Sequence, residues 1–202
     1  MQITEFLSDD IDTLLLIPFG HDDWIQHTKY MEQKLWEIGK KCVSIHSKRS
    51  MVKLIGKCDA ILINGGNTYK LLYYLYHYNL VPLLQKVIND GVPYIGMDQA
   101  GLSVACCTIQ TCLDIPIIQP PTFKALSVIP FQLIARYDEY CEATCYEEQI
   151  ERFLRENKQF DLSVLGLCGN SYLIIRDNRI RLKGSGKGAV LYRDYKSEKE
   201  EI

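Results

Sequence analysis

Short apolar runs alternate with helix-length segments throughout the first half of this chain. Runs of strand length are predicted at residues 13–18, 42–45, 59–63 and 92–95. Between them, apolar residues recur near helical spacing over 23–39, 51–55 and 69–89, and Pro82 is expected to break the last segment into two helices. Strands separated by helices form parallel sheets, because a parallel connection has to cross back over the sheet. The sequence therefore predicts an α/β fold whose mostly parallel sheet carries helices on both faces.

The second half follows a different pattern. Prolines at 116, 120, 121 and 130 predict extended segments and turns over 108–130. An amphipathic helix is predicted at 147–157, followed by strands at 162–167, 172–175 and 179–182 with a hairpin turn at 176–179. The sequence contains no repeat and no linker-like stretch, so we expect a single domain over 1–202 with a frayed, charged tail at 196–202.

The composition argues against several classes of partner. A net charge of −2 and a pI of about 6.1 predict no basic surface of the kind that binds nucleic acid. The longest apolar runs have strand length and predict no membrane span. Residues 1–10 lack the basic start of a secretory signal, so we expect a cytoplasmic protein. The eight cysteines form no Cys-x-x-Cys pair, which favours reduced thiols over zinc or disulfide sites. No metal and no cofactor is predicted.

Two glycine-rich turns follow predicted strands and form the candidate site. Asn64-Gly65-Gly66-Asn67-Thr68 follows the third strand, and Gly96-Met97-Asp98-Gln99-Ala100-Gly101 follows the fourth. In an open α/β sheet such loops form the ligand crevice, and glycines let backbone N–H groups approach a ligand closely. One turn could supply an oxyanion hole and the other a nucleophile. A tight turn with Asn67 or Thr68 as a helix cap explains the first loop equally well.

Longer stretches of the sequence resemble one enzyme family. The text I-N-G-G-N-T-Y-K-L-L, then V-A-C-C-T-I-Q-T-C-L-D-I-P-I and V-I-P-F-Q, is similar to segments of the peptidase E family, serine peptidase family S51. The similarity runs from about Leu15 to Leu182. It implies a three-layer, flavodoxin-like fold related to class I glutamine amidotransferases. It also implies hydrolysis of α-aspartyl dipeptides by a Ser-His-Glu type triad in active members.

This chain departs from the family pattern at the positions that carry the chemistry. Active relatives read G-x-S-A-G at the elbow, where this chain has one extra residue and places Asp98 or Gln99 at the nucleophile's position. Arg136 stands where the family has its general base, a histidine, and a guanidinium cannot accept a proton. Gly169 stands near the position of the triad acid, and Tyr146 stands near the position of the cation that binds the substrate carboxylate.

The resemblance and these departures together predict a catalytically inactive family member that serves as a binding or interaction module. Its partner is an unidentified protein or a small anionic or peptide ligand in the former cleft. The fixed cation of Arg136 favours an anionic ligand, although an ion pair between Arg136 and Asp98 explains the same residue. The predicted ligand-binding residues are Gly65, Gly66, Asn67, Thr68, Arg136 and Tyr146.

Two alternatives stay open. A rebuilt hydrolase would use Asp98 or Cys107 as its nucleophile, whereas Ser103 is expected to pack within a helix. His21 and His27 are expected at the surface, because nothing in the sequence pairs them with a nucleophile.

The second alternative is a subunit of a larger assembly, which includes a homo-oligomer. Its contacts would be made by exposed aromatic residues of one helix. These are Tyr73, Tyr74, Tyr76 and Tyr78.

Overall fold

The first half of the chain forms a sheet of four parallel strands in the order β2-β1-β3-β4. The strands are β1 (Thr13–Leu16), β2 (Lys41–Ser44), β3 (Ala60–Asn64) and β4 (Tyr94–Met97). Each lies within two residues of its predicted bounds, which confirms the parallel sheet. The computed structural model describes residues 4, 6–7, 10–47, 51–140, 144–160, 162–177, 179–184, 188–193 and 200–201.

The helices of the first half begin and end at recognisable signals. They are α1 (Trp24–Trp36), α2 (Met51–Ile55), α3 (Thr68–His77), α4 (Val81–Asn89) and α5 (Asp98–Ala105). The carboxylate of Asp23 caps α1 by accepting a hydrogen bond from Gln26 N at 2.8 Å. The predicted break at Pro82 is confirmed, because Pro82 lies in the first turn of α4, where an N–H has no helical partner.

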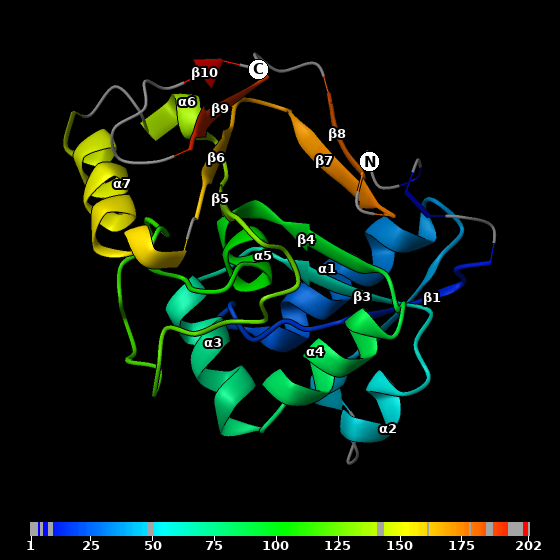
Figure 1. Cartoon of the computed structure of the whole chain (residues 1–202). Coiled ribbons are helices and arrows are strands. Elements are labelled where there is room, and N and C mark those ends of the chain that lie inside the picture. The colour runs from blue at the N-terminus through cyan, green and yellow to red at the C-terminus, as the bar shows by residue number, and fades with distance from the viewer. Residues whose placement is uncertain are drawn as a thin grey trace.

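Alternating side chains on the strands divide the core into two layers. Leu14 and Leu16 of β1 are fully buried against Met31 and other residues of α1. Leu15 points to the other face and joins buried leucines of α3 and α4. Successive strand residues point to opposite faces, so a strand buried on both sides reads as a continuous apolar run. Helices therefore cover both faces, with α2, α3 and α4 together on one side (Figure 1).

The second half forms a mixed sheet in the order β10-β9-β6-β5. Its strands are β5 (Gln132–Ile134), β6 (Val164–Leu167), β9 (Ala189–Tyr192) and β10 (Glu200–Glu201), and only β5 and β6 pair in parallel. Helices α6 (Tyr137–Tyr140) and α7 (Thr144–Glu156) accompany this sheet, and short 3-10 turns occur at η2 (Ile45–Ser47) and η3 (Lys158–Phe160). The predicted hairpin is confirmed as β7 (Tyr172–Arg176) and β8 (Arg179–Lys183), and it lies on the opposite side of the molecule from α2, α3 and α4 (Figure 1).

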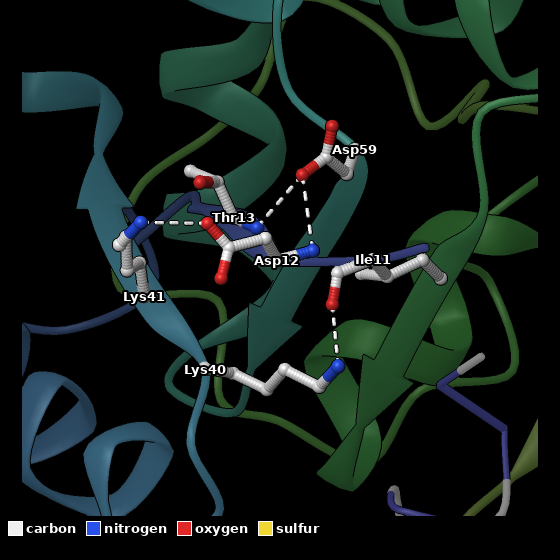
Figure 2. A network of polar contacts seen from close by, with 6 residues as sticks. All are labelled: Ile11, Asp12, Thr13, Lys40, Lys41 and Asp59. Atoms are coloured by element: carbon white, nitrogen blue, oxygen red, sulfur yellow. Dashed lines mark hydrogen bonds and ion pairs between the residues drawn. The ribbon is translucent and has the colours of Figure 1, made fainter. Parts of the chain in front are cut away.

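A polar network ties the amino ends of the parallel strands together (Figure 2). One carboxylate oxygen of Asp59 accepts hydrogen bonds from Asp12 N at 3.1 Å and from Thr13 N at 2.8 Å. The carboxylate of Asp12 in turn accepts from Lys41 Nζ at 2.7 Å. These bonds satisfy backbone donors at the start of β1. The carboxyl ends of the strands, at the opposite edge of the sheet, carry the two glycine turns.

The tyrosines of α3 and its C-terminal cap are partly buried, and their predicted role in an assembly stays a prediction. Tyr73, Tyr74, Tyr76 and Tyr78 are all half-buried. The ring of Tyr74 packs 5.9 Å from the ring of Phe19, and Tyr76 donates a hydrogen bond to Lys124 O at 2.9 Å. Tyr74, Tyr76 and Tyr78 all pack against the buried core cluster. In the described ranges, no helix has both the length and the apolar character needed to cross a bilayer.

Candidate functional site

The turn between β4 and α5 holds an acidic residue in a strained conformation. Asp98 follows Met97 directly, and its φ of +53° is a left-handed value that costs a non-glycine residue roughly 1–2 kcal/mol. Such strain persists where the surrounding structure determines the backbone, and a strained strand-to-helix turn is the geometry of a nucleophile elbow. Asp98, rather than Gln99, is therefore the strained residue of this elbow-like turn, with its side chain exposed.

Gln99 turns inward and connects the two halves of the molecule. Its Oε1 accepts a hydrogen bond from Ala135 N, just beyond β5, at 3.0 Å. Its Nε2 donates to Ser103 Oγ at 2.6 Å. Ser103 is completely buried, so the packing role predicted for it is confirmed and its hydroxyl is closed to solvent.

The glycine loop after β3 lies against the elbow. Gly65 N donates a hydrogen bond to Met97 O at 3.1 Å. A methyl group placed on Gly65 would lie 3.0 Å from Oδ2 of Asp98. On its other side the loop contacts the turn after β1, where a methyl group on Gly66 would lie 2.3 Å from the carbonyl carbon of Gly20. Three turns at the carboxyl ends of β1, β3 and β4 thus meet at one place, as expected of the crevice of an open α/β sheet.

Asn67 and Thr68 are engaged within the fold. Asn67 caps α3 by accepting from Lys70 N at 3.0 Å, and its Nδ2 donates to Ile115 O at 2.8 Å. Thr68 is completely buried, and both its N–H and its hydroxyl donate to the carboxylate of Asp114. Asp114 belongs to a stretch that carries the family resemblance, but its contact with Thr68, 46 residues away, could not be read from that stretch. The ligand-binding assignment of Asn67 and Thr68 stays a prediction.

Arg136 and Gly169, which the family resemblance aligns near catalytic positions, lie around the second sheet. Arg136 follows β5 with a φ of +51° and forms an ion pair with Glu139 at 3.6 Å. No ion pair joins Arg136 to Asp98, although both residues belong to the described ranges. Gly169, in the turn after β6, donates its N–H to a carboxylate oxygen of Asp138 at 2.8 Å. The side chain of Tyr146 lies outside the described residues, so its predicted role stays a prediction.

A cavity of about 430 Å³ opens beside the elbow. It lies between α1 and the turns after β3 and β4, and its volume is that of a small-molecule site. The lining residues are His21, His27, Tyr30, Met31, Lys34, Asn64, Gly65, Gly66, Met97 and Asp98. Both early histidines are therefore half-buried wall residues, which corrects the prediction that they belong to the outer surface. The sequence could not identify them because only the folded loops bring them to the same cavity as Asp98.

The two histidines stack with ring centroids 3.5 Å apart. His21 Nε2 lies 2.6 Å from Asn64 O, and a carbonyl oxygen only accepts, so this nitrogen carries the proton. His27 Nε2 is buried and has no hydrogen-bond partner among the described residues. Burial of the ring and, to a smaller extent, electrostatic repulsion by the nearby His21 lower the pKa of His27 from 6.5 to about 4. His27 is therefore neutral near pH 7.

We expect His27 to make the protein less stable in mild acid. The unfolded state binds more protons between pH 6.5 and about 4, so the stability is full above pH 6.5 and falls as the pH drops through about 4. The whole shift corresponds to about 3 kcal/mol, and contact of the ring with solvent reduces the expected loss to about 1–2 kcal/mol. Urea unfolding of wild type and His27→Gln across this pH range checks it. His77→Gln, exposed on α3, is the matched control. An equally steep pH dependence in His27→Gln would contradict the assignment.

The described thiols next to the two glycine turns are not activated. Cys107 is half-buried, burial raises the pKa of its thiol, and Gln132 Nε2 donates to its sulfur at 3.0 Å. Burial also raises the pKa of the neighbouring Cys106 to about 12. A nucleophilic thiol needs the opposite shift. Within the ranges that the structure describes, no three His, Cys, Asp or Glu side chains are grouped closely enough to hold a metal ion.

Comparison with known proteins gives consistent relatives. The family model of peptidase family S51 matches residues 1–183. Peptidase E of Nostoc sp. (strain PCC 7120) is 34% identical over 206 residues, with 99% of this chain and 83% of the relative covered. Peptidase E of Streptomyces coelicolor is 31% identical, covering 89% of this chain and 74% of the relative. For peptidase E of Shewanella sp. (strain W3-18-1) the identity is 38%, with 74% and 64% covered.

The fold has a counterpart among solved structures. A crystal structure described as a peptidase E protein from Listeria monocytogenes EGD-e matches with a TM-score of 0.72 at 20% identity, covering 90% of this chain and 91% of that one. At this identity the match establishes the α/β architecture alone. The family model and the sequence relatives cover most of the chain, including both glycine turns. The chain belongs to peptidase family S51.

Proposed function

We propose that this family S51 protein does not cleave peptides by serine chemistry and uses its crevice to bind a small molecule. The observation that carries the proposal is Asp98 at the strained elbow, where the family resemblance expects serine. A carboxylate lacks the hydroxyl that a base activates, and its attack on an amide carbon gives a labile anhydride rather than an ester.

The surroundings of the elbow support the same proposal. Arg136 stands at the position expected of the general base, its guanidinium stays protonated, and it is paired with Glu139. His21 and His27 contribute imidazole groups to another wall of the crevice. The low pKa of His27, about 4, makes it a weak base near neutral pH. A strained residue and an open cavity are retained beside each other, which favours continued use of the crevice.

Hydrolysis of α-aspartyl dipeptides tests the loss of peptidase chemistry. We expect wild-type protein to cleave an Asp-X panel no faster than buffer, and Asp98→Ala to behave identically, because removing triad members that act as a unit costs several orders of magnitude. Release of free aspartate, followed by chromatography, is the measurement. The Nostoc peptidase E serves as a comparison protein under the same conditions. Wild-type cleavage that Asp98→Ala abolishes would overturn the proposal.

One observation favours a second function, a hydrolase that uses Asp98 as its nucleophile. His21 and His27 line the same cavity as Asp98, which places imidazoles near a carboxylate at an elbow. With a p-nitrophenyl ester, a carboxylate oxygen would bond to the acyl carbon and nitrophenolate would leave with the bonding electrons. Water would then hydrolyse the anhydride and restore the carboxylate. Ester turnover that is lost in Asp98→Asn and kept in Asp90→Asn, a remote exposed carboxylate, would establish this function.

A further inference from the structure

The carboxylate of Asp98 lies in the cavity wall beside the glycine loop. No hydrogen bond or ion pair of this carboxylate is found among the described residues, although the side chain lies in the wall of a 430 Å³ cavity. In the nearby glycine loop, Gly65 is the residue next to this carboxylate, and it has no side chain that could donate to it. An exposed carboxylate of this kind is satisfied by water until a ligand supplies donors.

The other charged or titratable groups near Asp98 are Lys34, His21 and His27, and within the described ranges none of them forms an ion pair with it. Lys34 lies at the wall, but both oxygens of Glu37 lie 3.1 Å from its Nζ and offset its charge. His27 is neutral near pH 7 because burial lowers its pKa to about 4. His21 donates from Nε2 to Asn64 O, so in its neutral form Nδ1 is a hydrogen-bond acceptor. The cavity therefore offers acceptors and one unpaired anion.

We infer that the cavity binds a small organic molecule carrying a primary ammonium group, which pairs with the carboxylate of Asp98. The inference rests on the proposed function, since Asp98 then acts as a binding group and not as a nucleophile. An ammonium supplies three donors, and a carboxylate and a neutral imidazole are suitable acceptors for them. The apolar part of the ligand would lie along Met31, Met97 and the ring of Tyr30, where aromatic faces also attract cations. The ligand class differs from the anionic ligand that Arg136 alone had indicated.

Paired probes with and without the positive charge test this inference. We expect 2-phenylethylamine to bind, and 2-phenylethanol, which has nearly the same shape and no charge, to bind at least about 10-fold more weakly. Asp98→Asn should weaken amine binding by about 10- to 100-fold and leave the alcohol unchanged. Isothermal titration calorimetry measures both. Asn is well tolerated at a left-handed φ, and the urea midpoint of Asp98→Asn verifies that the variant is folded.

A matched control separates local pairing from the general effect of charge. Asp22 is an exposed carboxylate on the loop that carries His21 and is paired with Lys70 outside the cavity lining. Asp22→Asn removes the same charge and should leave amine affinity within about 2-fold. Equal affinity for amine and alcohol, equal weakening by Asp22→Asn and Asp98→Asn, or no amine binding at about 10 mM would overturn the inference. Neither probe contains a hydrolysable bond, so this outcome is independent of the dipeptide assay.

Discussion

Gly66→Ala is expected to lower the free energy of unfolding by about 3–5 kcal/mol, through backbone strain and overpacking acting together. Gly66 has a φ of +84°, in the region that side chains other than glycine rarely adopt. An added Cβ would also lie 2.3 Å from the carbonyl carbon and 2.7 Å from Cα of Gly20. These are backbone atoms of the turn after β1, so relief requires a shift of the loop that carries His21. Urea unfolding followed by circular dichroism measures the loss.

Two other glycine substitutions separate the causes. Gly39 has a φ of +72° with nothing within 4 Å of an added Cβ, so Gly39→Ala should cost only about 1–2 kcal/mol from strain. Gly20→Ala meets the same close approach from the opposite side, with Gly65 O 2.7 Å from the new Cβ, and should cost about 1–3 kcal/mol from crowding. A loss in Gly66→Ala no larger than that in Gly39→Ala would show that the loops separate freely.

The α/β architecture could be predicted because its signals are short-range. The continuous apolar run beginning at Thr13 has strand length, and each β1 residue packs on the face opposite to its neighbour's. Pro82 and Asp23 mark helix starts by local chemistry that does not depend on tertiary contacts. The second sheet was harder: β5 has only three residues, and no run of alternating residues identifies it before its pairing with β6 is known.

The candidate site could be predicted only in part. The two glycine turns are visible in the sequence, because glycine is required where backbones approach closely. The sequence could not decide between Asp98 and Gln99, since one extra residue leaves two alignments and only the backbone φ distinguishes them. The place of His21 depends on a hydrogen bond to a carbonyl 43 residues away, and that of His27 on the ring stacked against it. Contacts at such separations leave no periodic trace in a single sequence.

Phe19→Ala is expected to lower the free energy of unfolding by about 3–5 kcal/mol, because it removes a fully buried aromatic ring. The ring of Phe19 lies 5.1 Å from Trp24, 5.3 Å from Tyr78 and 5.9 Å from Tyr74, centroid to centroid. Edge-on and tilted aromatic contacts of this kind contribute beyond the area that they bury. Phe19→Leu fills most of the space, so it should lower the free energy of unfolding by less than about 1.5 kcal/mol. Trp36→Ala, 78% exposed on α1, should change stability by no more than about 0.5 kcal/mol.

Phe19 immediately precedes Gly20 and His21, so the same ring supports the turn that forms one wall of the cavity. We therefore expect Phe19→Ala to weaken binding of 2-phenylethylamine by about 10-fold under conditions where the variant is still folded, whereas Phe19→Leu should keep most of the affinity. Calorimetry on the three proteins, each checked for folding by circular dichroism, measures this coupling. A large loss of stability with unchanged amine affinity would mean that the turn is positioned by its contact with Gly66 alone, and that the aromatic cluster beneath it serves the fold without serving the site.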